Sequence, residues 1–185
     1  MRVPSRCRAA LRLAALAGVV GLAGCGYTTR PGLVTSIRTV YVKPFVSKID
    51  ITQDVSRDQR FPIYRPGMET DVTNEVIHRF QFTGLLRPST AERADTRLEG
   101  ELMAFRRDAL RYDSGSHVEE WRLNVVVHLR FIDQKTNTVL WDEPNFIGDA
   151  TYFAQGANAE SEAGALERAI EDLARRVVER TVENW

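Results

Sequence analysis

The sequence predicts an α+β domain in which two helices pack on one face of a four-stranded mixed sheet, in the order β-α-β-β-β-α. Three observations lead to this prediction. Long segments after residue 95 alternate apolar and polar side chains, which is the period of a half-buried strand. Two other segments repeat apolar residues at every third or fourth position, as amphipathic helices do. Strands and helices do not alternate regularly, which favours one mixed sheet with both helices on the same face.

The composition is that of one ordinary globular domain preceded by a distinct N-terminal segment. The chain has 185 residues, of which 43% are apolar and 27% charged, with 25 basic and 25 acidic side chains. It is therefore too apolar for a disordered chain and lacks the basic excess of a nucleic-acid-binding protein. The first 24 residues contain four arginines and no acidic residue, so the remainder carries a net charge of 21 − 25 = −4.

Residues 1–24 are typical of a bacterial lipoprotein signal peptide. Their arginines precede residues 13–22, an uncharged apolar run with the length of a signal-peptide core. This run is shorter than the roughly 20 apolar residues of a membrane-spanning helix. Leu22, Ala23 and Gly24 then lead directly to Cys25, which resembles the lipobox of bacterial lipoproteins. The alternative is an ordinary signal peptide that a cysteine follows by chance.

The lipobox resemblance implies that Cys25 carries a diacylglycerol on its thiol and an acyl chain on its amine. Two or more acyl chains give stable membrane anchoring. The next residue is Gly26 rather than aspartate, which by resemblance to enteric lipoproteins implies the outer membrane, on its periplasmic side. Because Cys7 leaves with the signal peptide, the mature chain has no further thiol. This excludes a disulfide, a cysteine nucleophile and a thiolate metal site.

The first elements of the mature chain follow an irregular lipidated tether, residues 25–38. Residues 39–46 are β-branched and aromatic and predict a strand. Residues 47–66 are polar and without a clear period, a length that is typical of functional or disordered connections. A helix is expected from Met68, because apolar residues recur at every fourth position, and Gly84 is placed to end it.

Three further strands are predicted in the second half of the chain. From Asp95 the period changes to two, and a slip in the alternation near Phe105 predicts a bulge. The clearest strand covers residues 121–131, where every odd position is apolar. Residues 139–153 predict a last strand that is bent at Pro144.

A second helix beginning near Ala159 completes a domain over residues 39–185. With both helices on the apolar face, the alternate positions of the strands face away from them. These positions are Arg97, Glu99, Glu101, Arg122, Asn124, His128 and Arg130. Such a face meets either water or a partner with a polar surface, for example the interior of a water-filled barrel. Periodicity does not choose between the two.

Residues that could carry catalysis form no recognisable pattern. His78, His117 and His128 lack a metal-ligand spacing, and neither a G-x-S-x-G elbow nor a glycine-rich phosphate loop occurs. His117 with Glu119 and Glu120 is an alternative metal site, against the simpler interpretation of a solvated loop. We therefore predict that the protein is not an enzyme and uses no cofactor or metal.

Arg106, Arg107 and Arg111 are a candidate anion-binding cluster. Guanidinium groups suit bidentate contact with phosphate or carboxylate, and the chain around them is acidic after signal cleavage. The alternative is a charged strand end that discourages pairing with another sheet edge.

Five short motifs occur in order along the mature chain. They are residues 24–27 (Gly-Cys-Gly-Tyr), 40–45 (Val-Tyr-Val-Lys-Pro-Phe), 69–75 (Glu-Thr-Asp-Val-Thr-Asn-Glu), 94–100 (Ala-Asp-Thr-Arg-Leu-Glu-Gly) and 139–141 (Val-Leu-Trp). In this order they resemble the LptE (RlpB) family of lipopolysaccharide-assembly lipoproteins, over essentially all of residues 25–185. The resemblance implies two helices on a four-stranded sheet, which agrees with the fold predicted from periodicity.

The resemblance to LptE also implies a function and partners. It implies an outer-membrane subunit of the lipopolysaccharide translocon that plugs an LptD-type β-barrel, assists its assembly and helps to insert lipopolysaccharide. We assign Arg106, Arg107 and Arg111 as candidate lipopolysaccharide contacts on electrostatic grounds alone. Two alternatives are an anchored accessory lipoprotein of another envelope transport complex and a lipid-anchored hydrolase.

Overall fold

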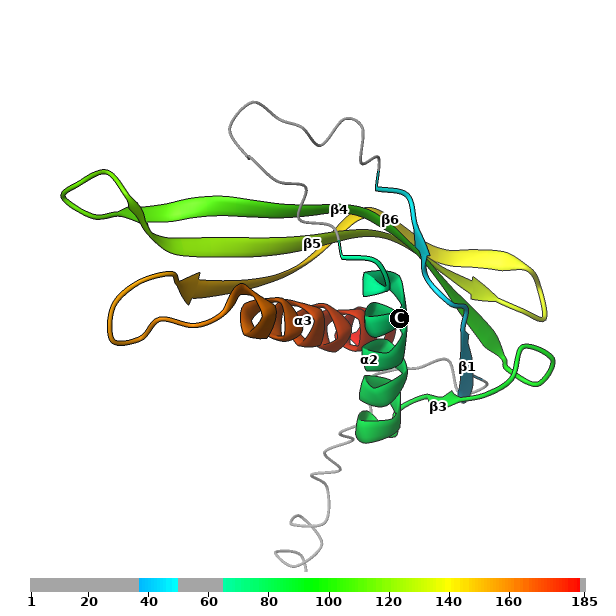
Figure 1. Cartoon of the computed structure of the whole chain (residues 1–185). Coiled ribbons are helices and arrows are strands. Elements are labelled where there is room, and N and C mark those ends of the chain that lie inside the picture. The colour runs from blue at the N-terminus through cyan, green and yellow to red at the C-terminus, as the bar shows by residue number, and fades with distance from the viewer. Residues whose placement is uncertain (1–36, 50–64, 184–185) are drawn as a thin grey trace, which may run out of the picture. The chain divides into compact units, whose positions relative to one another are not determined.

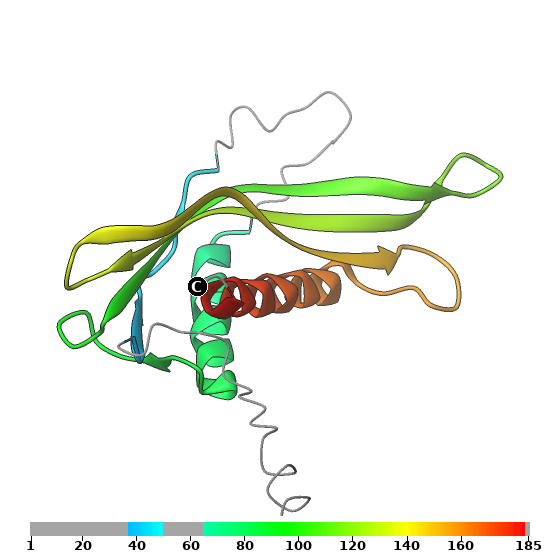
Figure 2. The ribbon, with the colours of Figure 1, turned by 180° about the vertical axis from the view of Figure 1, so that it is seen from behind.

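Six strands form a mixed sheet in the order β3-β1-β4-β5-β6, and β2 pairs with β4 beside β1. The structure, a computed structural model, describes residues 37–49 and 65–183. The predicted signal peptide, the lipobox, Cys25 and most of the polar segment 47–66 therefore lie outside the described residues. Figures 1 and 2 show both helices on one face of the sheet, as the sequence predicts.

The strands comprise three short segments and three long antiparallel ones. Their bounds are β1 Thr39–Val42, β2 Val46–Ser47, β3 Arg87–Pro88, β4 Thr96–Tyr112, β5 Val118–Asp133 and β6 Thr138–Phe153. The strand predicted over residues 39–46 divides around Pro44, which has no N–H to donate to a ladder. The two-residue β3, parallel to β1, is too short to leave a periodic signal. The predicted α+β class is confirmed, while the predicted four strands become six.

Two helices cover the apolar face of the sheet: α2 (Met68–Thr83) and α3 (Glu162–Glu183). Gly84 ends α2 as predicted, with a φ of 64° and its N–H donating to the carbonyl of Phe80 at 3.1 Å. Helix α3 begins at Glu162, later than the predicted Ala159. The reason is that Ala159 forms a bridge with Phe153, and Ser161 Oγ accepts the N–H of Gly164 at 3.1 Å as a cap.

The core lies between the sheet and the helices, where α3 packs on β5 and β6 and α2 packs on α3, β1 and β3. Every odd residue of β5 from Leu123 to Phe131 is fully buried. At Gly148 of β6 the backbone of α3 comes very close. An added Cβ there would lie 2.4 Å from Leu173 Cβ and 2.6 Å from the carbonyl oxygen of Ala169, so the helix can approach because this residue is glycine.

A bulge in β4 changes which residues face the helices. Leu102 pairs with Val127 and Ala104 with Val126, so Met103 is the extra residue. The predicted slip near Phe105 is thus confirmed slightly earlier in the chain. In β6, the register is irregular around Pro144, and the strand continues through it, as predicted.

Asp95 joins β1, the start of β4 and the turn between β5 and β6. Its Oδ2 accepts hydrogen bonds from the backbone N–H groups of Arg38 at 3.0 Å and Thr39 at 3.2 Å, and from the Thr39 hydroxyl at 2.9 Å. Its Oδ1 lies 2.7 Å from Lys135 Nζ. The hydrogen bond from Lys135, followed by the one from the Arg38 backbone, holds the pKa of Asp95 well below its ordinary value.

Replacing Asp95 should lower stability in a pH-dependent way. At pH 7 we expect Asp95→Asn to lower the free energy of unfolding by about 1–3 kcal/mol, because a neutral amide replaces a carboxylate that accepts several hydrogen bonds. A lowered pKa means that this contribution is present above the ordinary pKa of 3.8 and is lost as the pH falls below it. Denaturant unfolding of both proteins across this range measures the difference.

The control for this experiment is Glu119→Gln, since Glu119 is a half-buried acidic residue outside the Asp95 contacts. It should show no comparable loss at pH 7. A stability difference for Asp95→Asn that persists unchanged into strong acid would contradict the assignment.

Candidate functional site

The face of the sheet opposite the helices carries an ionic network centred on Glu99 of β4. The Glu99 Oε1 lies 3.0 Å from Arg97 Nε and 3.4 Å from Lys43 Nζ. Its Oε2 lies 2.8 Å from Nη2 of Arg130, the residue directly opposite on β5. Only 14% of the Glu99 side chain is exposed, so its charge is largely surrounded by these three cations.

The same face continues with a second set of polar contacts from β4 across to β6. His128 Nε2 lies 2.7 Å from Asp142 Oδ1, and its Nδ1 lies 3.8 Å from Glu101 Oε2. Further along, Asn124 Nδ2 donates to Asp108 Oδ2 at 2.7 Å. The alternate positions that the sequence predicts to face away from the helices therefore carry mutually paired polar groups.

A shallow hollow between Lys43, Glu99, His128 and Arg130 has a volume of about 50 Å³. It is too small for a sugar or a peptide group, and its charged members already pair with one another. The face is thus suited to contact a hydrated, polar surface over a broad area rather than to enclose a substrate.

Arg107, one of the three predicted anion contacts, points towards the helices. Its Nη1 lies 2.7 Å from Glu162 Oε2 at the start of α3, and its Cζ lies 4.3 Å from the centre of the Trp121 ring. The hydroxyl of Tyr152 donates to the same Glu162 oxygen at 3.3 Å, and burial raises the pKa of Tyr152. Sequence reasoning missed this cluster, although placing the bulge at Met103 would have put Arg107 on the helix-facing side of β4.

The other two predicted arginines are separated from Arg107 by the pleat of β4. Arg106 is exposed and pairs in register with Asn124 on the open face. No described residue forms an ion pair with it. Arg111 lies 3.5 Å from Glu120 Oε2 and 5.6 Å from the centre of the Phe153 ring. The three are neighbours in the sequence, but the fold does not bring their guanidinium groups to one point.

The histidines take part in local contacts. His117 Nδ1 lies 3.3 Å from Asp113 Oδ2 in the β4–β5 turn, and His78 Nδ1 lies 3.5 Å from Glu75 Oε1 on α2. Within residues 37–49 and 65–183, no group of three or more His, Cys, Asp or Glu side chains could hold a metal ion. Among the described residues, the side chains of His117, Glu119 and Glu120 therefore do not come together as metal ligands.

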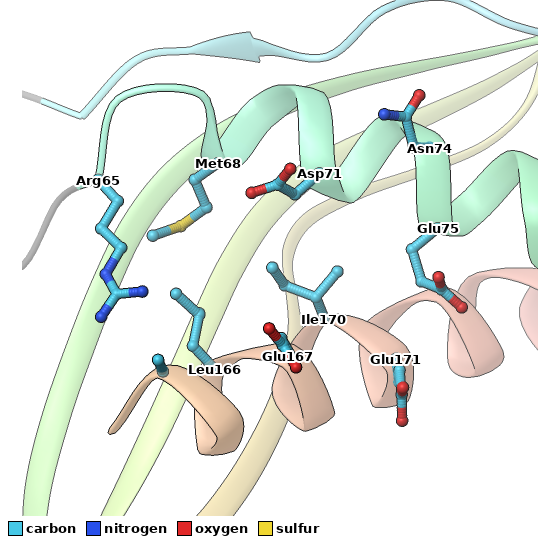
Figure 3. A pocket seen from close by; sticks show the side chains of 10 residues that line it. Arg65, Met68, Asp71, Asn74, Glu75, Leu166, Glu167, Ile170 and Glu171 are labelled. Atoms are coloured by element: carbon cyan, nitrogen blue, oxygen red, sulfur yellow. The ribbon is translucent and has the colours of Figure 1, made fainter. Parts of the chain in front are cut away.

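A groove of about 450 Å³ lies between the first turns of α2 and α3 (Figure 3). Met68, Leu166 and Ile170 supply its apolar side chains, and carboxylates line it from both helices, namely Asp71, Glu75, Glu167 and Glu171. With four carboxylates and one guanidinium, that of Arg65, the groove is acidic and disfavours a phosphorylated lipid. None of the helices that the structure describes is both long and apolar enough to cross a membrane.

The fold and this site define an α+β domain with one sheet face packed on helices. The other face carries sets of paired charges beside apolar side chains such as Ile147. The chain belongs to the LptE family, described as lipopolysaccharide-assembly, whose family model matches residues 37–181. No curated protein is significantly similar to it in sequence.

Solved structures share the fold at low sequence identity. The hypothetical protein CT253 from Chlamydia trachomatis is 12% identical with a TM-score of 0.51, covering 80% of this chain and 98% of that one. Protein XCC0632 from Xanthomonas campestris is also 12% identical, with a TM-score of 0.55 and coverages of 84% and 91%. At this identity, the likeness shows the fold alone.

The Glu99 network should contribute modestly to stability. We expect Glu99→Gln to lower the free energy of unfolding by about 1 kcal/mol, because three partly exposed cations lose a shared carboxylate. Glu101→Gln removes a carboxylate from the same strand face, and the ion pair of Glu101 with His128 is long at 3.8 Å. It should change stability by less than about 0.5 kcal/mol. Urea unfolding that gives equal losses for both variants would contradict a central role for Glu99.

Proposed function

We propose that this protein is the plug subunit of an LptD-type outer-membrane β-barrel, where it assists barrel assembly and the insertion of lipopolysaccharide. The observation that carries the proposal is the paired ionic face of β4 and β5. The interior of a large outer-membrane barrel is polar and hydrated. On this sheet face Glu99 contacts both Arg97 and Arg130. Charges that contact one another in this way cost less to bring into such a lumen than isolated charges would.

The proposed anchor is Cys25, acylated after cleavage behind Leu22, Ala23 and Gly24. Each buried methylene contributes about 0.8 kcal/mol, so several acyl chains hold a protein stably at a membrane. We propose that these lipids insert in the periplasmic leaflet of the outer membrane and that residues 25–38 connect them to the domain. Membership of a lipopolysaccharide-assembly family supports this location.

In this proposal the protein acts by occupancy and binding, with no bond made or broken and no cofactor. The polar groups of the open face pair with each other rather than forming an activated nucleophile and base. The function thus depends on the shape and charge of the domain inside its partner.

We also propose that Arg106, Arg107 and Arg111 contact phosphate groups of lipopolysaccharide. Arg106 is the best placed, because it is exposed on the open face. The side chain of Arg111 is 58% exposed and its pair with Glu120 is long at 3.5 Å, so it can turn to a ligand at small cost. Arg107 would have to share its charge between a ligand and Glu162.

Purification in mild detergent should recover a much larger β-barrel protein together with the lipidated chain. A Cys25→Ser variant is the matched control, since it removes the acylated thiol and leaves the domain unchanged. We expect the wild-type protein to be membrane-bound and in complex, and the variant to lose the membrane anchor. Recovery of an inner-membrane or periplasmic component in place of a barrel would instead indicate an accessory lipoprotein of another transport complex.

Reversing the charge of Arg106 should weaken lipopolysaccharide binding. We expect Arg106→Glu to reduce affinity about 10- to 100-fold, because a charge-assisted hydrogen bond contributes about 1.5–3 kcal/mol, while unfolding and barrel association stay unchanged. Arg65→Glu is the control, because Arg65 is also exposed but lines the acidic groove between the helices. Equal binding by wild type and Arg106→Glu, measured with immobilised lipopolysaccharide, would remove Arg106 from the site.

A further inference from the structure

Two large apolar side chains are exposed where α2 ends. Phe82 is 76% exposed and Leu85, just after the terminal Gly84, is 46% exposed. The next residue, Leu86, is fully buried in the core, so the chain is anchored directly after the exposed pair. An exposed phenylalanine next to an exposed leucine at the end of a helix favours contact with an apolar phase or partner.

Three arginines lie on or beside the segment that carries this apolar pair. Arg79 lies on α2 with its Cζ 5.6 Å from the centre of the Phe82 ring. Arg87 and Arg38 are exposed on neighbouring segments, where the N–H of Arg87 donates to the carbonyl of Arg38 at 3.0 Å. In the parts of the chain that the structure describes, none of the three forms an ion pair. Residues 76–91 contain no acidic side chain, and the Asp95 carboxylate that accepts the Arg38 N–H is already paired with Lys135. This end of α2 is therefore locally cationic.

The chain also enters the domain here. Ile37 is buried in the core, and the adjoining β1 pairs with β3 next to the end of α2 (Figure 1). Residues 26–36 separate Cys25 from Ile37. Fully extended, such a connection reaches about 40 Å, so an anchor on Cys25 holds Ile37 within that distance of the bilayer.

We propose that the patch formed by Arg38, Arg79, Phe82, Leu85 and Arg87 rests on the surface of the phospholipid bilayer. Phe82 and Leu85 would enter the headgroup region, and the guanidinium groups would bind lipid phosphates. Interfacial anchors combine apolar side chains with cationic ones in this way. Each arginine near an anionic surface strengthens the contact about fivefold. The proposal rests on the lipid anchor of the proposed function and adds an orientation of the domain on the membrane.

The test uses the full lipidated protein, reconstituted in vesicles of phosphatidylethanolamine and phosphatidylglycerol. With Cys25 acylated, the mature chain has no other thiol, so one introduced cysteine accepts a polarity-sensitive fluorophore. The probe position is Leu85→Cys, and the control is Leu110→Cys near the far turn of β4 and β5. The two leucines are similarly exposed, at 46% and 42%.

We expect the label at position 85 to shift its emission to the blue and to be quenched by brominated lipids. The label at position 110 should remain in water. Combining Arg38→Gln with Arg87→Gln should lower the equilibrium constant for contact of the patch with anionic vesicles about 25-fold. Each arginine accounts for about fivefold. A label at position 85 that stays in water would overturn the proposal. So would a label whose emission shifts only when the barrel partner is added.

Flotation of the same vesicles tests the lipid anchor separately. If the protein floats but the position-85 label stays in water, the anchor stands and the patch is wrong. If the protein fails to float but the label is quenched at high vesicle concentration, the patch stands and the lipid anchor is wrong. If neither signal appears, both are wrong.

Discussion

The antiparallel pairing of β5 with both of its neighbours is the constraint on which the rest of the structure depends. Because β5 is bonded to β4 and β6 along nearly its whole length, its side chains have only two directions to take. Its odd residues are buried against the helices, while Arg130 and His128 are directed to the opposite face. Both the core and the ionic network follow from this one alternation.

Sequence periodicity was sufficient for the elements that obey a regular period. The strand over residues 121–131 was evident because alternate apolar positions continue without interruption, and α2 was evident from its stripe and from Gly84. β3 escaped prediction, because two residues carry no period and their pairing with β1 is set by α2 packing above them. The start of α3 was misplaced for a similar reason, since the bridge of Ala159 to Phe153 is a tertiary contact.

The candidate site was less predictable, because it depends on what lies across the strands. Arg106, Arg107 and Arg111 look like one cluster in the sequence, but the Met103 bulge and the pleat assign them different surroundings. The link of Arg107 to Glu162 spans a distance of 55 residues in the chain. Likewise, the role of Asp95 depends on Thr39 and Lys135, which lie on separate segments. No local sequence pattern predicts contacts between segments so far apart in the chain.

The close fit at Gly148 has a mechanical consequence. Ala169 and Leu173 of α3 occupy the space that any side chain of residue 148 would need. The position of the helix on β6 is therefore fixed by this contact. Sliding it along the strand would drive its own side chains into the neighbouring residues of the sheet. Any substitution at position 148 would therefore lift α3 from β6 and open the core that the two elements close between them.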